Sequence, residues 1–301
     1  MNQRSIGGIA VFLSAFMWAL EPLAAKFSYI QSTFLETSII RAYVIIIIAA
    51  AYILIKNSGT SFTINKIQIC SLFYIAVIGT LCADLIYFYA LVTTPVLNAV
   101  LIGHLQPMFI ILLAFVLLRS ERLGRYTYVG VLFMMLSAVF VSTRTIDNAL
   151  SLQFGNFGDL LVLVATILWS TTALAMRKYL LSLDAGTITF YRFFFASIIF
   201  TISLPFVNII SVNIYQISVG IIVGVGTICY YEGLKRLKAA EVSGIELAAP
   251  VFAAFIGFFF IQEQITGLQI TGIILLFAGV YLLTTNKQKI GLSNLSIRGR
   301  I

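Results

Sequence analysis

The sequence predicts an all-α integral membrane protein with ten transmembrane helices, arranged as two inverted five-helix repeats with both termini in the cytoplasm. Apolar residues make up 60% of the 301 residues and charged residues only 10%, whereas an ordinary soluble domain is about 45–50% apolar and about 25% charged. The apolar residues form ten long stretches, and several residue types recur at fixed spacings in the two halves. So few charges cannot coat a water-soluble surface, which excludes a soluble enzyme and a disordered chain.

Ten apolar stretches are long enough to cross a bilayer. They cover residues 6–27, 34–55, 67–91, 96–118, 126–143, 157–177, 187–207, 215–234, 241–262 and 268–285. About 20 helical residues span a hydrocarbon core of about 30 Å. Strands of a barrel would alternate apolar and polar residues, and runs such as 44–51 do not, so we expect helices. The first stretch contains Glu21-Pro22 and lacks a cleavage site, which favours a retained span over a signal peptide.

The distribution of basic residues predicts the orientation. With the N-terminus in the cytoplasm, 15 of the 19 Lys and Arg residues fall in cytoplasmic loops or tails and only Arg144 falls in an outer loop. Cytoplasmic loops of membrane proteins are enriched in Lys and Arg, so we expect both termini inside. These positions also account for the net charge of +8 without a nucleic-acid partner.

The two halves of the chain repeat one another. The matching pairs are Trp18/Trp169 and Arg41/Arg192 at a spacing of 151 residues, Tyr87/Tyr230, Leu91/Leu234 and Pro107/Pro250 at 143, and Glu121/Glu263, Gly130/Gly272 and Thr143/Thr285 at 142. We expect one five-helix repeat over 4–143, a second over 155–285, and a basic cytoplasmic tail over 286–301. Because five is odd, the second repeat must be inverted in the membrane, which is typical of alternating-access transporters.

These repeats resemble the EamA-like branch of the drug/metabolite transporter superfamily. The resemblance rests on motifs that recur in order: Ala15-Phe16-Met17-Trp18-Ala19 with Lys26, Trp169-Ser170 with Lys178, Tyr87-Phe88-Tyr89-Ala90-Leu91, Pro107-Met108-Phe109, Pro250-Val251-Phe252, Glu121-Arg122 and Glu263. It covers almost the whole chain and implies a ten-helix transporter with a central cavity between the repeats. Substrates in this superfamily range from amino acids to nucleosides, nucleotide sugars and cationic drugs, so the resemblance does not name one.

Ionisable residues within spans are costly in lipid and are candidates for function. Counted from the outer ends of their spans, four of them lie roughly 9–12 Å deep at 1.5 Å per residue: Glu21, Arg41, Asp84 and His104. Arg192 and Glu246 each lie near the inner end of a span. An arginine can hold a carboxylate through two parallel bonds. We therefore predict two gates, Arg41 with Asp84 or Glu21 at the outer mouth, and Arg192 with Glu246 at the inner mouth; ties between helices remain the structural alternative.

Aromatic residues complete the predicted site. Trp18 shares one helix face with Glu21, and Trp169 holds the matching place in the second repeat. Both lie too deep for the aromatic belt at the membrane surface, so we expect them to line a pocket. Tyr87 and Tyr230 are candidates as well, although tyrosines at helix ends are also typical of that belt. We expect kinks at Pro22, Pro107 and Pro250, and helix packing along Gly272 and Gly279.

The sequence thus predicts a multi-pass transporter of the cell (inner or plasma) membrane. Its substrates would be small metabolites such as amino acids or related amphipathic compounds, with export favoured and proton coupling through Asp84 or Glu21 left open. A nucleoside or nucleotide-sugar transporter and a non-transporting scaffold subunit are the alternatives. We expect no enzyme activity, cofactor or metal site, since the motifs HExxH, GxSxG and GxGD are absent from the sequence. The expected partners are the substrate and the lipid bilayer, and a homodimer is left open.

Overall fold

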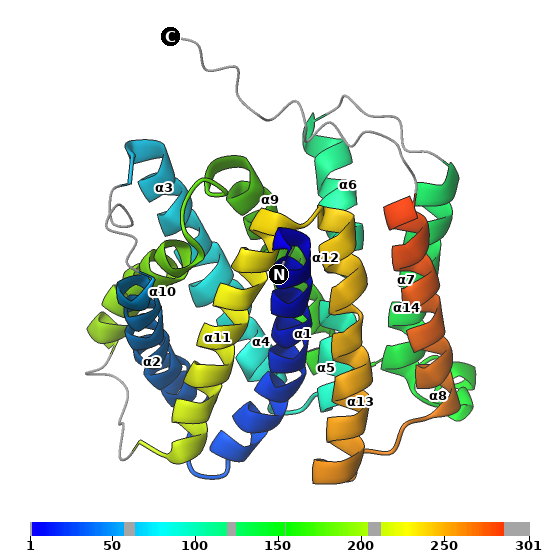
Figure 1. The fold of residues 1–301 in the computed structure, drawn as a ribbon. Helices are drawn as coiled ribbons and strands as arrows, with labels where there is room; N and C mark the ends of the chain where they lie inside the picture. Colours follow the sequence, from blue (N-terminus) through cyan, green and yellow to red (C-terminus); the bar gives the residue numbers. More distant parts are fainter. Residues whose placement is uncertain (1, 57–63, 119–124, 154, 204–211, 286–301) are drawn as a thin grey trace.

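A computed structural model describes residues 2–56, 64–118, 125–153, 155–203 and 212–285. Within these ranges the chain forms helices and no strands, and ten segments are long and apolar enough to span a membrane (Figure 1). The prediction of ten transmembrane helices is therefore confirmed. The predicted tail over 286–301 and Glu121 lie outside the described residues.

The first repeat contains five spans. They are α1 (Gln3–Ser28), α2 (Phe34–Ile55), a third span of α3 (Lys66–Tyr74), η1 (Ile75–Asp84) and α4 (Leu85–Ala90), a fourth of α5 (Val96–Gly103) and α6 (Gln106–Leu118), and α7 (Arg125–Thr143). The short helix α8 (Ile146–Leu150) leads to the second repeat. We call the end of the bundle that contains Gln3, Ile55 and Arg236 the N-terminal face, and the end that contains Ser28, Ala90 and Ile261 the far face (Figure 1).

The second repeat has the same order of spans. They are α9 (Phe157–Tyr179), α10 (Ala185–Ser203), α11 (Ile214–Arg236), a fourth span of α12 (Ala239–Glu246) and α13 (Ala248–Ile261), and α14 (Gly267–Thr285). Polar residues define several helix starts. Asn156 and Asp159 at α9, and Asn213 and Gln216 at α11, form reciprocal capping boxes that satisfy free backbone N–H groups.

The fourth span of each repeat is broken just before its proline. Helix α5 ends at Gly103 and α12 ends at Glu246, each four residues before Pro107 or Pro250. A proline has no N–H to donate to the carbonyl four residues upstream, so the helix is interrupted there. Helix α1 continues through Pro22 without a break. Interrupted backbone at membrane depth is tolerated where it is buried or lines a cavity, as in transporters.

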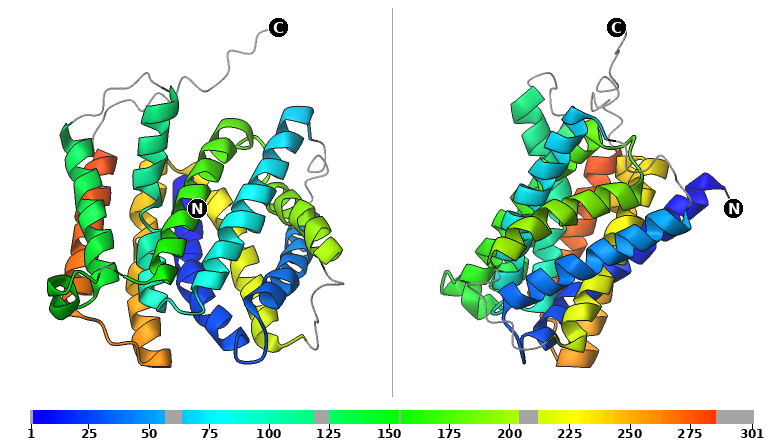
Figure 2. Two further views of the ribbon diagram at one scale, coloured as in Figure 1. Left: turned by 180° about the vertical axis from the view of Figure 1, so that it is seen from behind. Right: turned by 90° about the vertical axis from the view of Figure 1, so that its left-hand side faces the viewer.

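The packing of the helices follows the repeat. Helix α1 packs along α11, and α9 packs against the third span of the first repeat, which is the equivalent pairing. The two equivalent helices α2 and α10 contact each other, and so do α7 and α14. Figures 1 and 2 show α7 and α14 side by side at one edge of the bundle. The halves therefore interlock around a common centre, as two inverted repeats would.

Glycines allow α7 and α14 to approach closely. A Cβ atom at Gly279 would lie 2.9 Å from the Gly130 carbonyl oxygen and 2.6 Å from Met134 Cγ. Ser137 also donates a hydrogen bond of 2.6 Å to the Gly272 carbonyl oxygen. The predicted packing stripe along Gly272 and Gly279 is confirmed, because only hydrogen fits where the backbones meet.

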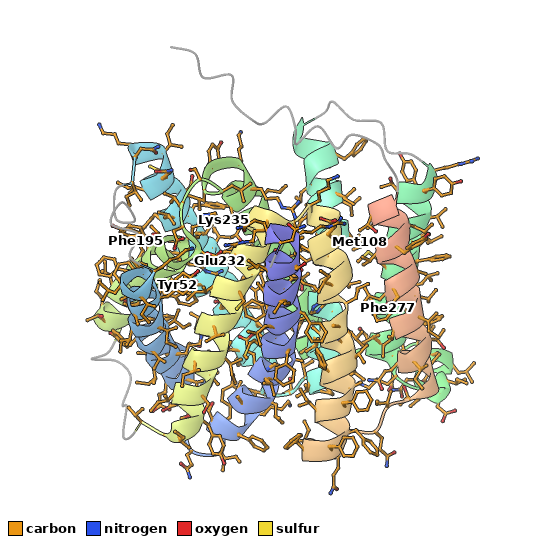
Figure 3. The ribbon with its side chains drawn as sticks, viewed as in Figure 1. Tyr52, Met108, Phe195, Glu232, Lys235 and Phe277 are labelled. Atoms are coloured by element: carbon orange, nitrogen blue, oxygen red, sulfur yellow. The ribbon has the colours of Figure 1, made fainter. Side chains whose placement is uncertain are left out.

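The outer surface of the bundle is apolar. Side chains such as Leu54 and Phe259 are 72% and 69% exposed, respectively, and Figure 3 shows apolar side chains projecting outward along the helices. Exposing so much apolar surface to water would be unfavourable, whereas contact with lipid tails is not. The protein is therefore a multi-pass membrane protein.

Candidate functional site

A cavity of about 160 Å³ lies between the two repeats. It has room for several water molecules or a small organic group. Its lining includes all of the residues proposed from the sequence for substrate binding or gating: Trp18, Glu21, Arg41, Asp84, Tyr87, His104, Trp169, Arg192, Tyr230 and Glu246. They come from both repeats. The structure thus brings the predicted residues together, although their role in transport remains a prediction.

Asp84 is the centre of the polar cluster in this cavity. Arg41 donates a hydrogen bond of 3.0 Å to its Oδ2, and Arg192 lies 3.3 Å from both of its carboxylate oxygens. The indole Nε1 of Trp169 donates to Oδ1 at 2.7 Å. Asp84 is only 5% exposed and Arg41 1%. Three N–H donors therefore satisfy the hydrogen-bonding capacity of this buried carboxyl group.

Glu21 is held much more loosely than Asp84. Its Oε1 lies 3.7 Å from Arg41, beyond hydrogen-bond distance.

Arg41 also packs over the ring of Phe88 at 4.1 Å from the centroid, a favourable cation–π arrangement. Phe88 and Leu91 are fully buried and follow the cluster toward the far face. Buried apolar side chains therefore continue from the cluster toward the far face.

The local shape of the third span positions Asp84. Residues Ile75–Asp84 form a π-helix, a wide helical turn that often occurs at functional sites. It places Thr80 where its hydroxyl accepts a hydrogen bond of 2.9 Å from Arg192 Nε. A Cβ at Gly79 would lie 3.3 Å from the Arg192 guanidinium, so glycine leaves room for the arginine. Neither Gly79 nor Thr80 was singled out from the sequence.

Arg192 and Glu246 do not pair in this structure, so the inner gate between them stays a prediction. Arg192 instead bonds Asp84, Thr80 and, at 3.3 Å, the hydroxyl of Tyr231. The carboxylate of Glu246 forms no ion pair or hydrogen bond with another described side chain, and His104 bonds only the backbone of Glu246. Counting residues from helix ends ignores the tilt of α10, visible in Figure 2, and the reach of the arginine side chain. Arg192 therefore joins the cluster of Glu21, Arg41 and Asp84, whereas Glu246 does not.

The remaining candidates surround this cluster. The rings of Tyr87 and Trp169 lie 5.1 Å apart, and those of Tyr230 and Tyr231 5.7 Å apart. His104 lies at the break between α5 and α6, where its Nδ1 is 2.7 Å from the Val100 carbonyl oxygen. That bond serves the helix end, so His104 does not join the charge cluster predicted for it. Among the described residues no group of His, Cys, Asp and Glu side chains could hold a metal ion.

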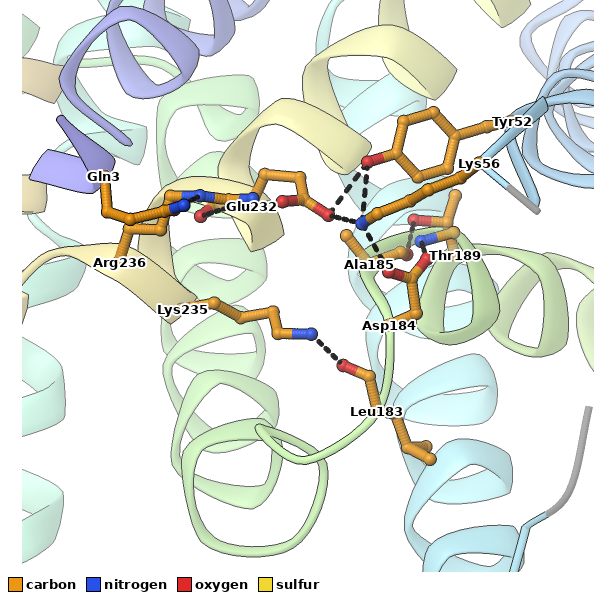
Figure 4. Close-up of polar contacts among 11 residues, drawn as sticks. Gln3, Tyr52, Lys56, Leu183, Asp184, Ala185, Thr189, Glu232, Lys235 and Arg236 are labelled. Carbon is orange, nitrogen blue, oxygen red and sulfur yellow. Dashed lines mark hydrogen bonds and ion pairs between the residues drawn. The ribbon is translucent and has the colours of Figure 1, made fainter. Parts of the chain in front are cut away.

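A second polar network lies at the N-terminal face. Lys56 Nζ bonds Asp184 at 2.6 Å and Glu232 at 2.8 Å, and Tyr52 also donates to Glu232 at 2.8 Å (Figure 4). Arg236 completes the network by pairing with Glu232. Partial burial lowers the pKa of Lys56, but its hydrogen bonds to two carboxylates and a tyrosine outweigh this effect and raise it above the usual lysine value. The network ties together the ends of α2, α10 and α11; Figure 3 shows its position.

A ten-helix bundle of two repeats with a polar cavity between them is the architecture of a secondary membrane transporter. The chain belongs to the EamA-like transporter family, whose sequence profile matches residues 5–143 and 156–285. Each of the two repeats therefore matches the family profile separately. The resemblance found in the sequence motifs is confirmed, and so is the two-repeat fold class.

Two similar proteins are also described as transporters. An uncharacterized transporter of Synechocystis sp. is 27% identical over 69% of this chain, and one of Methanothermobacter thermautotrophicus is 24% identical over 70%. The chain spans 63% of the length of each. A solved crystal structure is similar over 92% of this chain and 96% of its own, with a TM-score of 0.66 at 18% identity. That similarity concerns the fold alone.

Proposed function

We propose that this chain moves small amphipathic metabolites, with amino acids and their relatives as the first choice, across the cell membrane by alternating access. The observation that supports this most is the cavity between the repeats that joins aromatic side chains to a buried charge cluster. Binding sites of inverted-repeat transporters lie at this position. An aromatic and polar lining suits a substrate with a flat or apolar body and a charged end.

The proposal also covers the orientation of the protein in the membrane and the direction of transport. The excess of basic residues on one side favours a cytoplasmic N-terminal face, and export is the direction that the family resemblance favours. The far mouth would then be the outer mouth, and Arg41, with its contacts to Asp84 and Phe88, would close it. The cavity would be loaded from the cytoplasm and emptied after this closure opens.

Proton coupling would act through Glu21 rather than Asp84. Three N–H donors hold Asp84, whereas Glu21 lies 3.7 Å from Arg41 and accepts no hydrogen bond from another described side chain. Neutralising Glu21 would remove one of the two carboxylates that face Arg41. Arg41 would then be held less strongly, and the closure at the far mouth would loosen.

Transport by reconstituted vesicles tests the proposal. The purified protein would be placed in liposomes and offered a mixed pool of metabolites, with D84N as the site variant and E241Q as a control, because Glu241 pairs with Arg4 away from the cavity. We expect amino acids or related amines to move in the wild type and in E241Q, but not in D84N. Movement of phosphorylated compounds alone would favour a nucleotide-sugar transporter, and no movement at all would favour a scaffold subunit.

A further inference from the structure

The charges that line the cavity do not balance. Three carboxylates and two guanidinium groups line it, which leaves a formal charge of −1. Asp84 engages both arginines, and Glu21 lies near Arg41. Glu246 is the remaining carboxylate, and it has no ion pair or hydrogen bond with a described side chain. Among the described residues, the cavity therefore offers one carboxyl group without a cationic partner, and both of its guanidinium groups already have a carboxylate partner.

The surroundings of Glu246 suit a cation. Ser243 precedes Glu246 by one helical turn on α12 and also lines the cavity. Its hydroxyl can accept a second hydrogen bond from a primary ammonium group. Trp18 and Tyr230 line the same cavity, and the faces of aromatic rings attract cations. Arg177, in the last turn of α9, acts on Glu246 electrostatically but forms no ion pair with it.

The same arrangement disfavours an anion. A phosphate or carboxylate group would need Arg41 or Arg192 as its partner, and both already bond Asp84. Displacing Asp84 would leave a buried carboxylate without its donors, which is costly in a low-dielectric site. A primary amine does not require this displacement, because it can pair with the Glu246 carboxylate, which has no cationic partner in the protein.

We infer that Glu246, assisted by Ser243, is the anchor for the protonated amine of the substrate, and that the cavity selects primary amines attached to an apolar or aromatic body over anionic compounds of the same size. This inference rests on the proposed transport function and names the substrate chemistry for it. It assigns Glu246 a binding role in place of the gate role expected from the sequence.

Intrinsic fluorescence provides a direct test, because the chain has only two tryptophans and both line the cavity. The full-length protein in lipid nanodiscs would be titrated with 2-phenylethylamine, 2-phenylethanol, phenylacetate and phenyl phosphate. We expect saturable fluorescence changes with the amine, and at least about tenfold weaker binding of the alcohol and both anions; tenfold corresponds to about 1.4 kcal/mol.

Variants separate the anchor from the rest of the cavity. E246Q keeps the size of the side chain and should weaken amine binding at least about tenfold while leaving binding of the alcohol unchanged. S243A should weaken it less. E241Q, on the same helix but paired with Arg4, should have no effect. If E246Q does not fold, S243A and the four-ligand series in the wild type still decide the result.

Three results would overturn the inference: tighter binding of an anion than of the amine, unchanged amine affinity in E246Q, or no saturable amine binding by the wild type. Its failure is distinguishable from failure of the proposed function. Vesicles that still transport other metabolites would leave the transporter intact and remove only the role of Glu246.

Discussion

Arg41 and Arg192 hold equivalent positions in the two repeats, 151 residues apart, yet both donate to the same carboxylate, that of Asp84. The position that matches Asp84 in the second repeat, at the spacing of 143 residues, is Thr227. Thr227 also lines the cavity but carries no charge. The inverted repeat is therefore symmetric in its arginines and asymmetric in its carboxylate, which concentrates the charges in one cluster.

Loss of the Asp84 carboxylate should destabilise the protein strongly. D84N leaves the buried Arg192 without its carboxylate partner and leaves Arg41 with only Glu21, 3.7 Å away. Breaking a buried ion pair by removing one partner costs about 3–5 kcal/mol. Thermal unfolding in detergent would measure the change. E241Q is the matched control, since exposed pairs contribute about 0–1 kcal/mol.

A balanced double variant checks the cause. D84N with R192Q removes one charge of each sign and leaves Glu21 near Arg41. If uncompensated charge is what destabilises D84N, the double variant should recover part of the lost stability. Equal or greater loss in the double variant would show that packing around Asp84, rather than its charge, is the main contribution.

Proton coupling should depend on Glu21. E21Q removes the loosely held carboxylate, so transport in vesicles should no longer respond to an imposed proton gradient, while movement down the substrate gradient continues. The measurement compares uptake with and without the gradient in the wild type and E21Q. A response to the gradient that persists in E21Q would exclude Glu21 as the proton-binding residue.

The sequence predicted the spans and the cavity lining better than the contacts. Membrane helices follow from apolar length, and the repeat places the equivalent residues, such as Trp18 and Trp169, at a common centre. The partner of Arg192 could not be predicted from the sequence. Counting residues from a helix end gives only a rough depth for the Cα atom, and it ignores both the tilt of the helix and the length of the arginine side chain. The π-helix that positions Thr80 has no sequence signal that periodicity detects.

Membrane topology gives a direct check on the orientation. Reporters that are active only in the cytoplasm should be active when fused after Ser58 or Asn286, and inactive after Asp147. The physical reason is that the excess of Lys and Arg holds those loops inside. The reverse pattern would place the N-terminal face outside and overturn the proposed direction of loading.

The network at Lys56 should contribute modestly to stability. K56M leaves Asp184 and Glu232 without their shared cation, and we expect a loss of about 1 kcal/mol, since Lys56 is partly exposed and solvent screens the pair. R4Q, which breaks the more exposed pair with Glu241, is the matched control and should have a smaller effect.

The effect of K56M should also depend on pH in a defined way. The folded-state pKa of Lys56 is raised, so its contribution is fully present below the ordinary lysine pKa of about 10.4 and is lost as pH rises through the higher folded value. The stability difference between wild type and K56M should therefore stay constant from neutral to mildly alkaline pH. A difference that disappears near neutral pH would contradict the raised pKa.

The closure at the far mouth should open when Arg41 loses its charge. Leu91 is fully buried beyond the cluster, whereas Val92 is 53% exposed. In a variant without the three native cysteines, Leu91→Cys should react slowly with a maleimide that cannot cross the membrane, and Val92→Cys should react quickly.

R41Q with E21Q removes one charge of each sign and leaves Asp84 bonded to Arg192. The fold should therefore persist, although the link from α2 to Asp84 is lost. We expect several-fold faster labelling of Leu91→Cys and unchanged labelling of Val92→Cys in this background. If neither labelling nor transport changes, Arg41 ties helices together and is not a gate.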